Sequence, residues 1–285
     1  MVQDVFSLHT IAGGDNVAFP FNIKDYQRYV FGDDKLAYRY GTDLAKAFIH
    51  GPGFGATQPS QPSNTTTGNQ GPSNDFAVAV LSEYVPTATH SLRNYFIAYL
   101  NRHLVSIAAT PACKIDIYSV GKHSQVRHGP QANDTESYHI DRARVQGRTI
   151  IVLADIRMRQ DREVQFIDSL RKLKVDNLVI FVYLASIDGP ANTAALSPIL
   201  SFVVSPSLKD IESIAQASTF TMNDCFVRFA LGQDYTEFCQ FIRRQDDCPA
   251  RQLLDYAIGG GYYDDDLYKQ NVKFLLWEVG ARESL

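Results

Sequence analysis

The chain has 285 residues, of which 45% are hydrophobic and 20% charged, so it can bury one large core or two modest ones. A formal net charge of −4 and an isoelectric point near 6.0 give no broad basic surface for nonspecific binding of nucleic acid. No stretch reaches the roughly 20 apolar residues of a membrane span, and the first ten residues lack the pattern of a signal peptide. We therefore expect a cytoplasmic protein, with a nuclear one as the alternative, and neither nucleic acid nor a membrane as its partner.

The four cysteines are widely spaced, with no Cys-x-x-Cys pair and no histidine cluster to accompany them. They are Cys113, Cys225, Cys239 and Cys248. This spacing predicts neither a zinc site nor a disulfide framework. We expect reduced thiols, most of them packed inside the protein.

The first part of the chain combines a helix with a long polar insertion. Residues 24–33 are aromatic and polar, and residues 35–50 carry apolar side chains on one side at helical spacing, ending at Gly51. Residues 51–75 are rich in Gly, Pro, Ser, Thr, Asn and Gln, which is too polar a composition to form a core. We predict a surface insertion within a domain.

Strand, loop and helix then follow one another. Residues 76–81 form a short apolar run typical of a buried strand, and after the loop at 82–87 a long helix is expected over 88–107. Residues 114–120 alternate as a third strand, and residues 121–148 are polar and irregular. This order is typical of a parallel sheet with crossover helices.

The most informative stretch is Gly147 to Glu163, where an apolar run stops at Asp155 and a polar loop begins. Thr149 to Leu153 is apolar without alternation, as in a parallel strand that is covered on both faces. Such strands deliver residues to ligand crevices at their carboxyl ends. The alternative is that Asp155 caps the next helix or accepts bonds from loop amides.

Three arginines crowd the loop before the helix expected over residues 164–173. Arg157, Arg159 and Arg162 lie near its N-terminus, where backbone N–H groups favour an anion and where Arg can fork onto phosphate oxygens. The alternative is that these arginines are simply solvated, and Asp161 adds a negative charge to the same loop. The pattern therefore indicates a phosphate site, and a loop of solvated arginines remains the alternative.

The rest of the chain completes the sheet and then turns helical. Strands are expected at 177–185 and 201–204, a helix at 207–217, and helical patterns from residue 223 onward with breaks at Gly232, Pro249 and 259–261. The predicted fold class is α/β, a mainly parallel central sheet flanked by helices. We predict a core over residues 1–222, including an N-terminal extension packed beside it, and a helical C-terminal subdomain over residues 223–285.

Several motifs resemble those of type I phosphoribosyltransferases. I-I-V-L-A-D-I-R-M-R-Q-D-R, from residue 150 to 162, resembles their phosphate loop, with Asp155 at its second acidic position. D-Y-Q-R-Y-V-F-G-D at 25–33 and S-E-Y-V-P-T-A at 82–88 resemble motifs of the phosphoribosyltransferase-like proteins associated with tellurite-resistance (ter) stress operons. The helix at 37–44 resembles the one that follows the first of these motifs. The order of the motifs over about the first 200 residues is more specific than any one of them.

The resemblance implies transfer of ribose 5-phosphate from phosphoribosyl pyrophosphate (PRPP) to a nitrogenous base with release of pyrophosphate, a pentosyltransferase reaction helped by Mg²⁺. It gives Asp155 the role of orienting the ribose hydroxyls and of contacting the metal. The 5-phosphate would be held by Arg157, Arg159, Gln160, Asp161 and Arg162. The pyrophosphate would lie at Ser82, Glu83, Tyr84 and Thr87, with catalytic cations from Lys122, Arg127 and His128. Residues 125–129 also resemble a basic mobile loop of orotate phosphoribosyltransferases, and a solvated polar loop is the alternative there.

Three departures from these motifs indicate that a second function is an alternative. Ala154 stands at the first acidic position, Arg159-Gln160-Asp161 stands where Thr-Gly-Thr is usual, and Val30 replaces a basic residue. A cradle of bulkier residues lets backbone amides approach a phosphate less closely. The alternative is a catalytically degenerate protein on the same fold, which acts as a nucleotide-binding, phosphate-binding or regulatory interaction module. The expected partner is a small phosphorylated ribose ligand, and a homodimer is left open.

Overall fold

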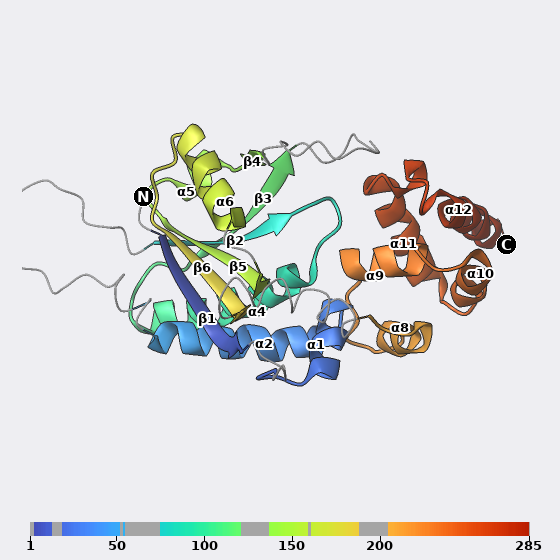
Figure 1. The fold of residues 1–285 in the computed structure, drawn as a ribbon, viewed down its shortest axis with the longest axis horizontal. Helices are drawn as coiled ribbons and strands as arrows, with labels where there is room; N and C mark the ends of the chain where they lie inside the picture. The colour runs from blue at the N-terminus through green and yellow to red at the C-terminus, as the bar shows by residue number, and fades with distance from the viewer. Residues whose placement is uncertain are drawn as a thin grey trace, which may run out of the picture.

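A computed structural model describes residues 3–12, 19–51, 54, 75–120, 137–158, 161–187 and 205–284. Within these residues six strands form one sheet in the order β1-β6-β5-β2-β3-β4 (Figure 1). The strands are β1 (Gln3–Ile11), β2 (Phe76–Ser82), β3 (Cys113–Val120), β4 (Ser137–His139), β5 (Thr149–Arg157) and β6 (Val179–Ile187). All neighbours pair in parallel except β3 and β4, which are antiparallel. The predicted α/β fold with a mainly parallel sheet is confirmed.

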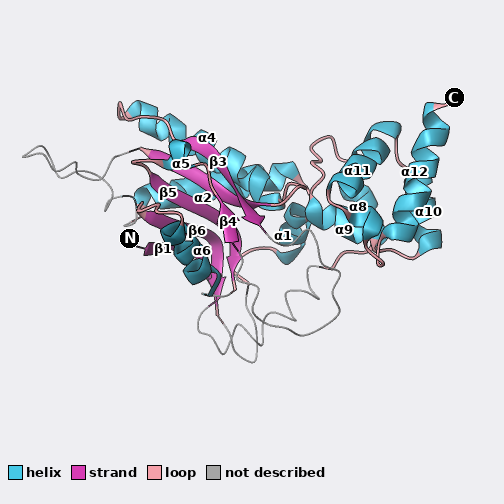
Figure 2. Cartoon of the chain, turned by 90° about the horizontal axis from the view of Figure 1, so that it is seen from above, coloured by secondary structure: helices cyan, strands magenta, loops and turns pink. Residues whose placement is uncertain are grey.

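Helices cover both faces of this sheet (Figure 2). One face packs against α1 (Ile23–Val30), α2 (Asp34–His50) and α4 (Ala88–Ser106), and the other against α5 (Arg142–Val145) and α6 (Asp161–Lys172). Successive strand residues alternate between the two cores, with Ile151 and Leu153 on the first face and Ile150 and Val152 on the second. Coverage on both faces explains why β5 has an uninterrupted apolar sequence.

The close crossing of α2 and α4 depends on one glycine. A Cβ atom at Gly41 would lie 2.6 Å from the backbone oxygen of Leu92 and 3.0 Å from the Cβ of Tyr95. A real Cβ does not approach a backbone oxygen this closely, so the missing side chain lets the two helices approach each other. The helix pair forms the layer beneath the sheet.

The C-terminal helices, α8 to α12, lie together beyond the carboxyl ends of the strands (Figure 1). They are α8 (Leu208–Ala215), α9 (Asp224–Leu231), α10 (Tyr235–Arg243), α11 (Asp247–Gly259) and α12 (Lys269–Glu283), with the 3-10 turn η1 (Tyr262–Asp264) before the last. Their buried side chains belong to the same hydrophobic core as α1, α2 and α4. The buried amide of Asn223 donates to the backbone oxygen of Val30 at 2.9 Å and fastens α9 to α1. The helical C-terminal region is confirmed, while the division of the chain at residues 222 and 223 stays a prediction.

Most elements expected from periodicity are confirmed, with boundaries shifted by a few residues. Four expectations were wrong. Residues 121–148 were expected to be irregular, but their described part contains β4 and α5. The N-terminal extension is not packed beside the sheet but supplies its edge strand, β1, which pairs with β6 through backbone hydrogen bonds. Strand β5 continues past Asp155 to Arg157. Pro249 does not break a helix but lies in the first turn of α11, where proline costs no intrahelical hydrogen bond.

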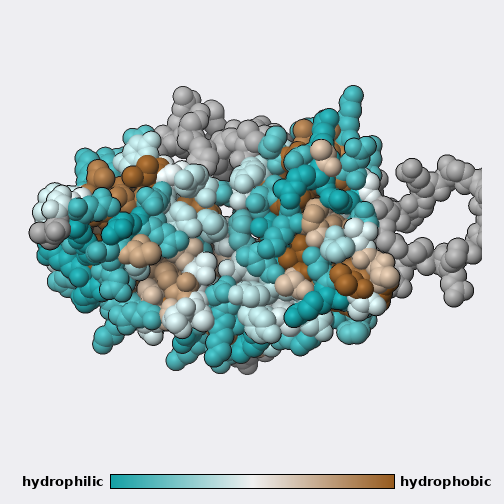
Figure 3. Space-filling view, turned by 180° about the vertical axis from the view of Figure 1, so that it is seen from behind, coloured by the Kyte–Doolittle hydropathy of each residue, from teal (hydrophilic) through white to brown (hydrophobic). Residues whose placement is uncertain are grey.

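Two expectations fall outside the described residues. They are the strand at 201–204 and most of the polar insertion at 51–75. All four cysteines are free, and of these Cys239 is buried and Cys248 exposed. Figure 3 shows a largely hydrophilic surface on which hydrophobic residues form separate patches. Among the described helices, a membrane-spanning length of apolar residues does not occur.

Candidate functional site

Two of the sequence motifs end side by side at the carboxyl edge of the sheet. Strands β2 and β5 are parallel neighbours, and Val80 pairs with Leu153. Continuing this register by two residues brings Ser82 level with Asp155. The loop after β2 and the segment between β5 and α6 therefore leave the sheet next to each other, which is where open α/β sheets bind ligands.

Asp155 lies at this edge with a hydrogen-bond partner from a distant part of the chain. The hydroxyl of Tyr26 on α1 donates to its Oδ2 at 3.0 Å, and the backbone N–H of Ile156 donates to its Oδ1 at 2.8 Å. Tyr26 is buried, whereas Asp155 is partly exposed. Burial raises the pKa of Tyr26, and the Asp155 carboxylate raises it further. Asp155 thus accepts a hydrogen bond from a backbone N–H, as one alternative expected, but this N–H belongs to its own strand and not to the loop.

Two more side chains near Asp155 come from α1 and α9. Tyr29 lies three residues after Tyr26, is 1% exposed, and its hydroxyl has no hydrogen-bond partner among the described residues. Cys225 lies in the first turn of α9. Burial raises the pKa of the Cys225 thiol to about 12, with further contributions from Asp224 and Asp155. No sequence motif identifies these residues, because only the fold brings α1 and α9 to the end of β5.

The side chain of His90 holds the loop after β2 in place. The Thr87 backbone N–H donates to Nδ1 of His90 at 3.0 Å, and His90 Nε2 lies 3.1 Å from Ser82 Oγ. Because Nδ1 accepts, the proton of the neutral ring is on Nε2, which donates to Ser82. Burial lowers the pKa of His90, and Arg93 lowers it further. Ser82 is therefore hydrogen-bonded by a neutral histidine and is not activated as a nucleophile.

The same loop also contacts the C-terminal helices. Nη2 of Arg228 on α9 lies 3.2 Å from Glu83, and its Nε donates to both carboxylate oxygens of Asp224 at 2.8 and 2.9 Å. The backbone N–H of Asp224 donates to the oxygen of Pro86 at 2.8 Å. Tyr84 is 58% exposed, and its ring lies so close to Gly259 on α11 that a Cβ there would be 1.8 Å away. Glu83 and Tyr84 thus connect the loop to the helices that cover the sheet edge.

Arg157 is engaged inside the protein. Its Nε and Nη2 donate to the two carboxylate oxygens of Glu163 at 2.5 and 2.8 Å, and the Tyr183 hydroxyl donates to Glu163 Oε1 at 2.8 Å. Glu163 is 2% exposed, and the pairing raises the pKa of Arg157. The guanidinium predicted to bind phosphate is therefore matched by a carboxylate of α6.

The remaining predicted residues divide into placed and unplaced groups. Asp161 begins α6, and Arg162 follows it as an exposed side chain. Outside the described residues lie Arg159, Gln160, Lys122, Arg127 and His128. The parallel pairing of β2 and β5 therefore places Asp155 and the loop of Ser82, Glu83, Tyr84 and Thr87 at the same edge of the sheet.

The described residues do not form a metal site by themselves. Among them, no group of three or more His, Cys, Asp or Glu side chains is placed to hold a metal ion. Asp155 lacks a second carboxylate next to it because residue 154 is alanine. Mg²⁺ commonly binds one or two carboxylates together with substrate phosphates. The donor set at this edge fits Mg²⁺ only if a phosphorylated ligand supplies most of the oxygen atoms.

Comparison with known protein families identifies a match over nearly the whole chain. A family described as PRTase ComF-like matches residues 2–275, which is nearly the whole chain and includes both the sheet and most of the C-terminal helices. No curated protein matches the chain.

Proposed function

Since the chain belongs to the PRTase ComF-like family, we propose that it binds a phosphorylated ribose at the carboxyl edge of strands β2 and β5. The observation that carries this proposal is the parallel pairing of these strands, which brings the loop at Ser82 beside Asp155. A ligand with a phosphate at each end of a ribose matches two loops that flank one carboxylate.

In this proposal the ribose hydroxyls lie at Asp155 and the 5-phosphate lies at the start of α6. Asp155 is partly exposed and accepts hydrogen bonds from Tyr26 and Ile156, so its oxygens retain capacity for further donors. The N-terminus of α6 favours an anion, with Arg159, Gln160, Asp161 and Arg162 as the residues that would surround it. Arg157 is held by Glu163, so we assign it to positioning α6 unless a ligand displaces that carboxylate.

The pyrophosphate side of the proposed ligand would face the loop of Ser82, Glu83, Tyr84 and Thr87. Lys122, Arg127 and His128 are the cations proposed to approach it. Mg²⁺, when bound with the ligand, supplies charge neutralisation on the pyrophosphate oxygens. The expected ligand remains a small molecule, and a homodimer remains a prediction.

Binding without rapid transfer is the function that the geometry supports best. Ala154 removes one acceptor for the ribose hydroxyls, and the guanidinium of Arg157 is already paired. Both features weaken the stabilisation of charge that develops as the glycosidic bond breaks. We therefore propose a nucleotide-binding or phosphate-binding module that acts through its ligand, as a regulatory or interaction protein.

PRPP-dependent transfer to a nitrogenous base is the second candidate, and one observation favours it. Helix α9 is hydrogen-bonded to the loop after β2 through Asp224 and to α1 through Asn223, so it lies beside the sheet edge. A helix fixed beside this edge limits the access of water to a bound ligand, and transfer through an oxocarbenium-like state requires that water be excluded. Release of pyrophosphate from PRPP with any member of a nucleobase panel would establish this candidate in place of binding alone.

Calorimetric titration tests the proposed binding. PRPP and ribose 5-phosphate are titrated into the full chain with and without Mg²⁺, and into Asp155→Asn and Asp168→Asn variants. Asp168 is an exposed carboxylate on α6, paired with Arg171 at 2.9 Å, and serves as the matched control. We expect saturable heat from the parent and the control and a clear loss of affinity for Asp155→Asn. The proposal is refuted if neither PRPP nor ribose 5-phosphate produces saturable heat with the parent protein.

A further inference from the structure

We infer that Tyr29 is a ligand-binding residue whose buried hydroxyl, together with Asp155 and Tyr26, recognises a ribose hydroxyl. This inference rests on the proposed function and adds a residue that the sequence motifs do not identify. It also proposes how the site compensates for Ala154, because a tyrosine hydroxyl can bond to the same alcohol that a second carboxylate would have held.

The first support is the unsatisfied hydroxyl itself. Tyr29 is 1% exposed, and its oxygen has no hydrogen-bond partner among the described residues. Buried polar atoms without a partner are rare in folded proteins, because the desolvated group loses its bonds to water. A partner that arrives from outside the chain would remove this cost only in the bound state.

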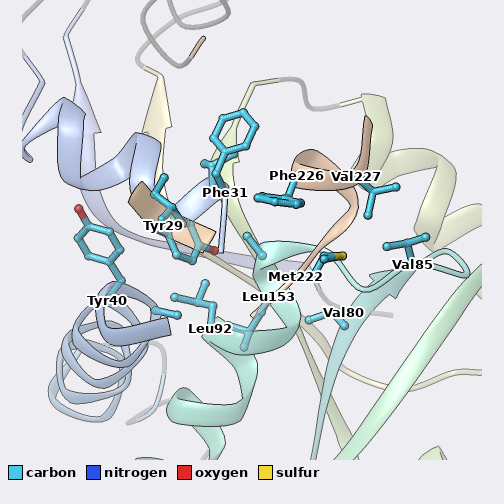
Figure 4. Close-up of a cluster of buried hydrophobic side chains, with 14 of the residues drawn as sticks. Tyr29, Phe31, Tyr40, Val80, Val85, Leu92, Leu153, Met222, Phe226 and Val227 are labelled. Atoms are coloured by element: carbon cyan, nitrogen blue, oxygen red, sulfur yellow. The ribbon is translucent and has the colours of Figure 1, made fainter. Parts of the chain in front are cut away.

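The second support is the direction of the side chain. Tyr26 and Tyr29 are three residues apart on α1, so they project from the same side of the helix, and their ring centroids are 5.9 Å apart. Tyr26 already donates to Asp155 at 3.0 Å. Figure 4 shows the Tyr29 oxygen pointing away from Tyr40 and toward the side where Met222 and Phe226 lie, neither of which offers a strong hydrogen-bond partner.

The third support is the set of charges around the hydroxyl. Burial raises the pKa of Tyr29, and the neighbouring Asp155 and Cys225 raise it further. Tyr29 and Tyr26 are buried, while Asp155 and Cys225 are partly exposed, so the cluster has an accessible side at the carboxylate and the thiol. The hydroxyl therefore remains a neutral donor that is influenced by the Asp155 carboxylate but makes no hydrogen bond to it.

This arrangement selects a neutral hydroxyl rather than an anion. An alcohol can accept from Tyr29 and donate to Asp155 at the same time. A phosphate at this position would face the negative charge of Asp155 without a cation among the residues of the cluster. The chemical class is thus a sugar hydroxyl, and the phosphates belong at the two loops. A bound water could satisfy Tyr29 in the same way and is the competing explanation.

Phenylalanine at residue 29 separates these explanations. Parent, Tyr29→Phe and Tyr40→Phe proteins are compared by thermal unfolding and by calorimetric titration with ribose 5-phosphate and its 2-deoxy and 3-deoxy analogues. The Tyr40 hydroxyl accepts from Nη2 of Arg39 at 3.4 Å and points away from Tyr29 (Figure 4). Tyr40→Phe is therefore the matched control. Removing an unpaired hydroxyl should leave the Tm unchanged or higher.

We expect Tyr29→Phe to weaken ribose 5-phosphate binding about tenfold, in line with one lost hydrogen bond. The loss should disappear with the deoxy analogue that lacks the contacted hydroxyl, and Tyr40→Phe should bind as the parent does. Equal affinity of Tyr29→Phe and parent would overturn the inference and favour a bound water. A loss of the same size with both deoxy analogues would also overturn it. If the parent binds neither ribose 5-phosphate nor PRPP, the proposed function itself fails.

Discussion

Replacing Glu163 by glutamine should measure how strongly the end of β5 is fastened to α6. The carboxylate accepts two bonds from Arg157 and one from Tyr183, and it is 2% exposed. Glutamine keeps the shape and one acceptor, but its NH₂ group then faces an Arg157 N–H. Breaking a buried ion pair costs about 3–5 kcal/mol. Because the Arg157 side chain is 22% exposed and can recover some hydration, we expect about 2–3 kcal/mol here.

Urea denaturation at pH 7 provides the measurement, and a chain of this size should also lose roughly 5–10 °C in Tm. Asp168→Asn is the control on the same helix, because it breaks an exposed pair with Arg171 and should cost less than about 0.5 kcal/mol. Arg157→Met and the double variant complete a cycle, whose coupling energy should be about 1–2 kcal/mol. The reasoning is refuted if Glu163→Gln and Asp168→Asn unfold at the same urea concentration.

Three further predictions concern packing, pH and a buried amide. Gly41→Ala should lower the free energy of unfolding by about 1–3 kcal/mol in urea denaturation, because its Cβ would lie 2.6 Å from the Leu92 backbone oxygen; a neutral result would show that the two helices separate freely. Since burial and Arg93 lower the pKa of His90, the unfolded chain binds a proton that the native chain does not, so stability present above about pH 6.5 is lost as pH falls. The urea concentration at the midpoint of unfolding should therefore be lower at pH 5 than at pH 7.5 in the parent, and this decrease should be smaller in His90→Asn. An equal decrease in both proteins would contradict this. Asn271→Ala should cost about 2 kcal/mol by thermal unfolding, since its buried amide donates to the backbone oxygens of Leu231 and Gln233 at 2.8 Å each; an unchanged Tm would count against it.

Strong local patterns predicted the elements that carry the site. Strand β5 was predictable because Thr149 to Leu153 is apolar without alternation, and the loop at Ser82 was predictable because a helical pattern follows a short apolar run. The edge strand β1 was missed because nearly all its described side chains are exposed or half-buried, so it lacks the uninterrupted apolar run of a strand that is covered on both faces. The same holds for the extension of β5 to Arg157, where polar residues continue the strand at the edge of the sheet.

Site residues were predictable only where a motif identified them. Asp155 and Ser82 belong to motifs, and their side-by-side arrangement follows once β2 and β5 are parallel neighbours. The direction of a flexible charged side chain cannot be predicted from such motifs. Arg157 and Glu163 are six residues apart, yet no spacing rule says that the arginine turns toward the carboxylate rather than toward a ligand.

The sequence by itself determined the α/β class, the helical C-terminal region and the place of Asp155 at the end of a buried strand, because these depend on hydrophobic periodicity and on motifs within short stretches of chain. Only the tertiary structure decided what surrounds that carboxylate. Tyr26 reaches Asp155 across 129 residues, and Tyr29 and Cys225 come from two further positions on α1 and α9. Contacts of this kind depend on how whole elements pack, since burial and electrostatic interaction act between neighbours in space and leave no periodic signal along the chain.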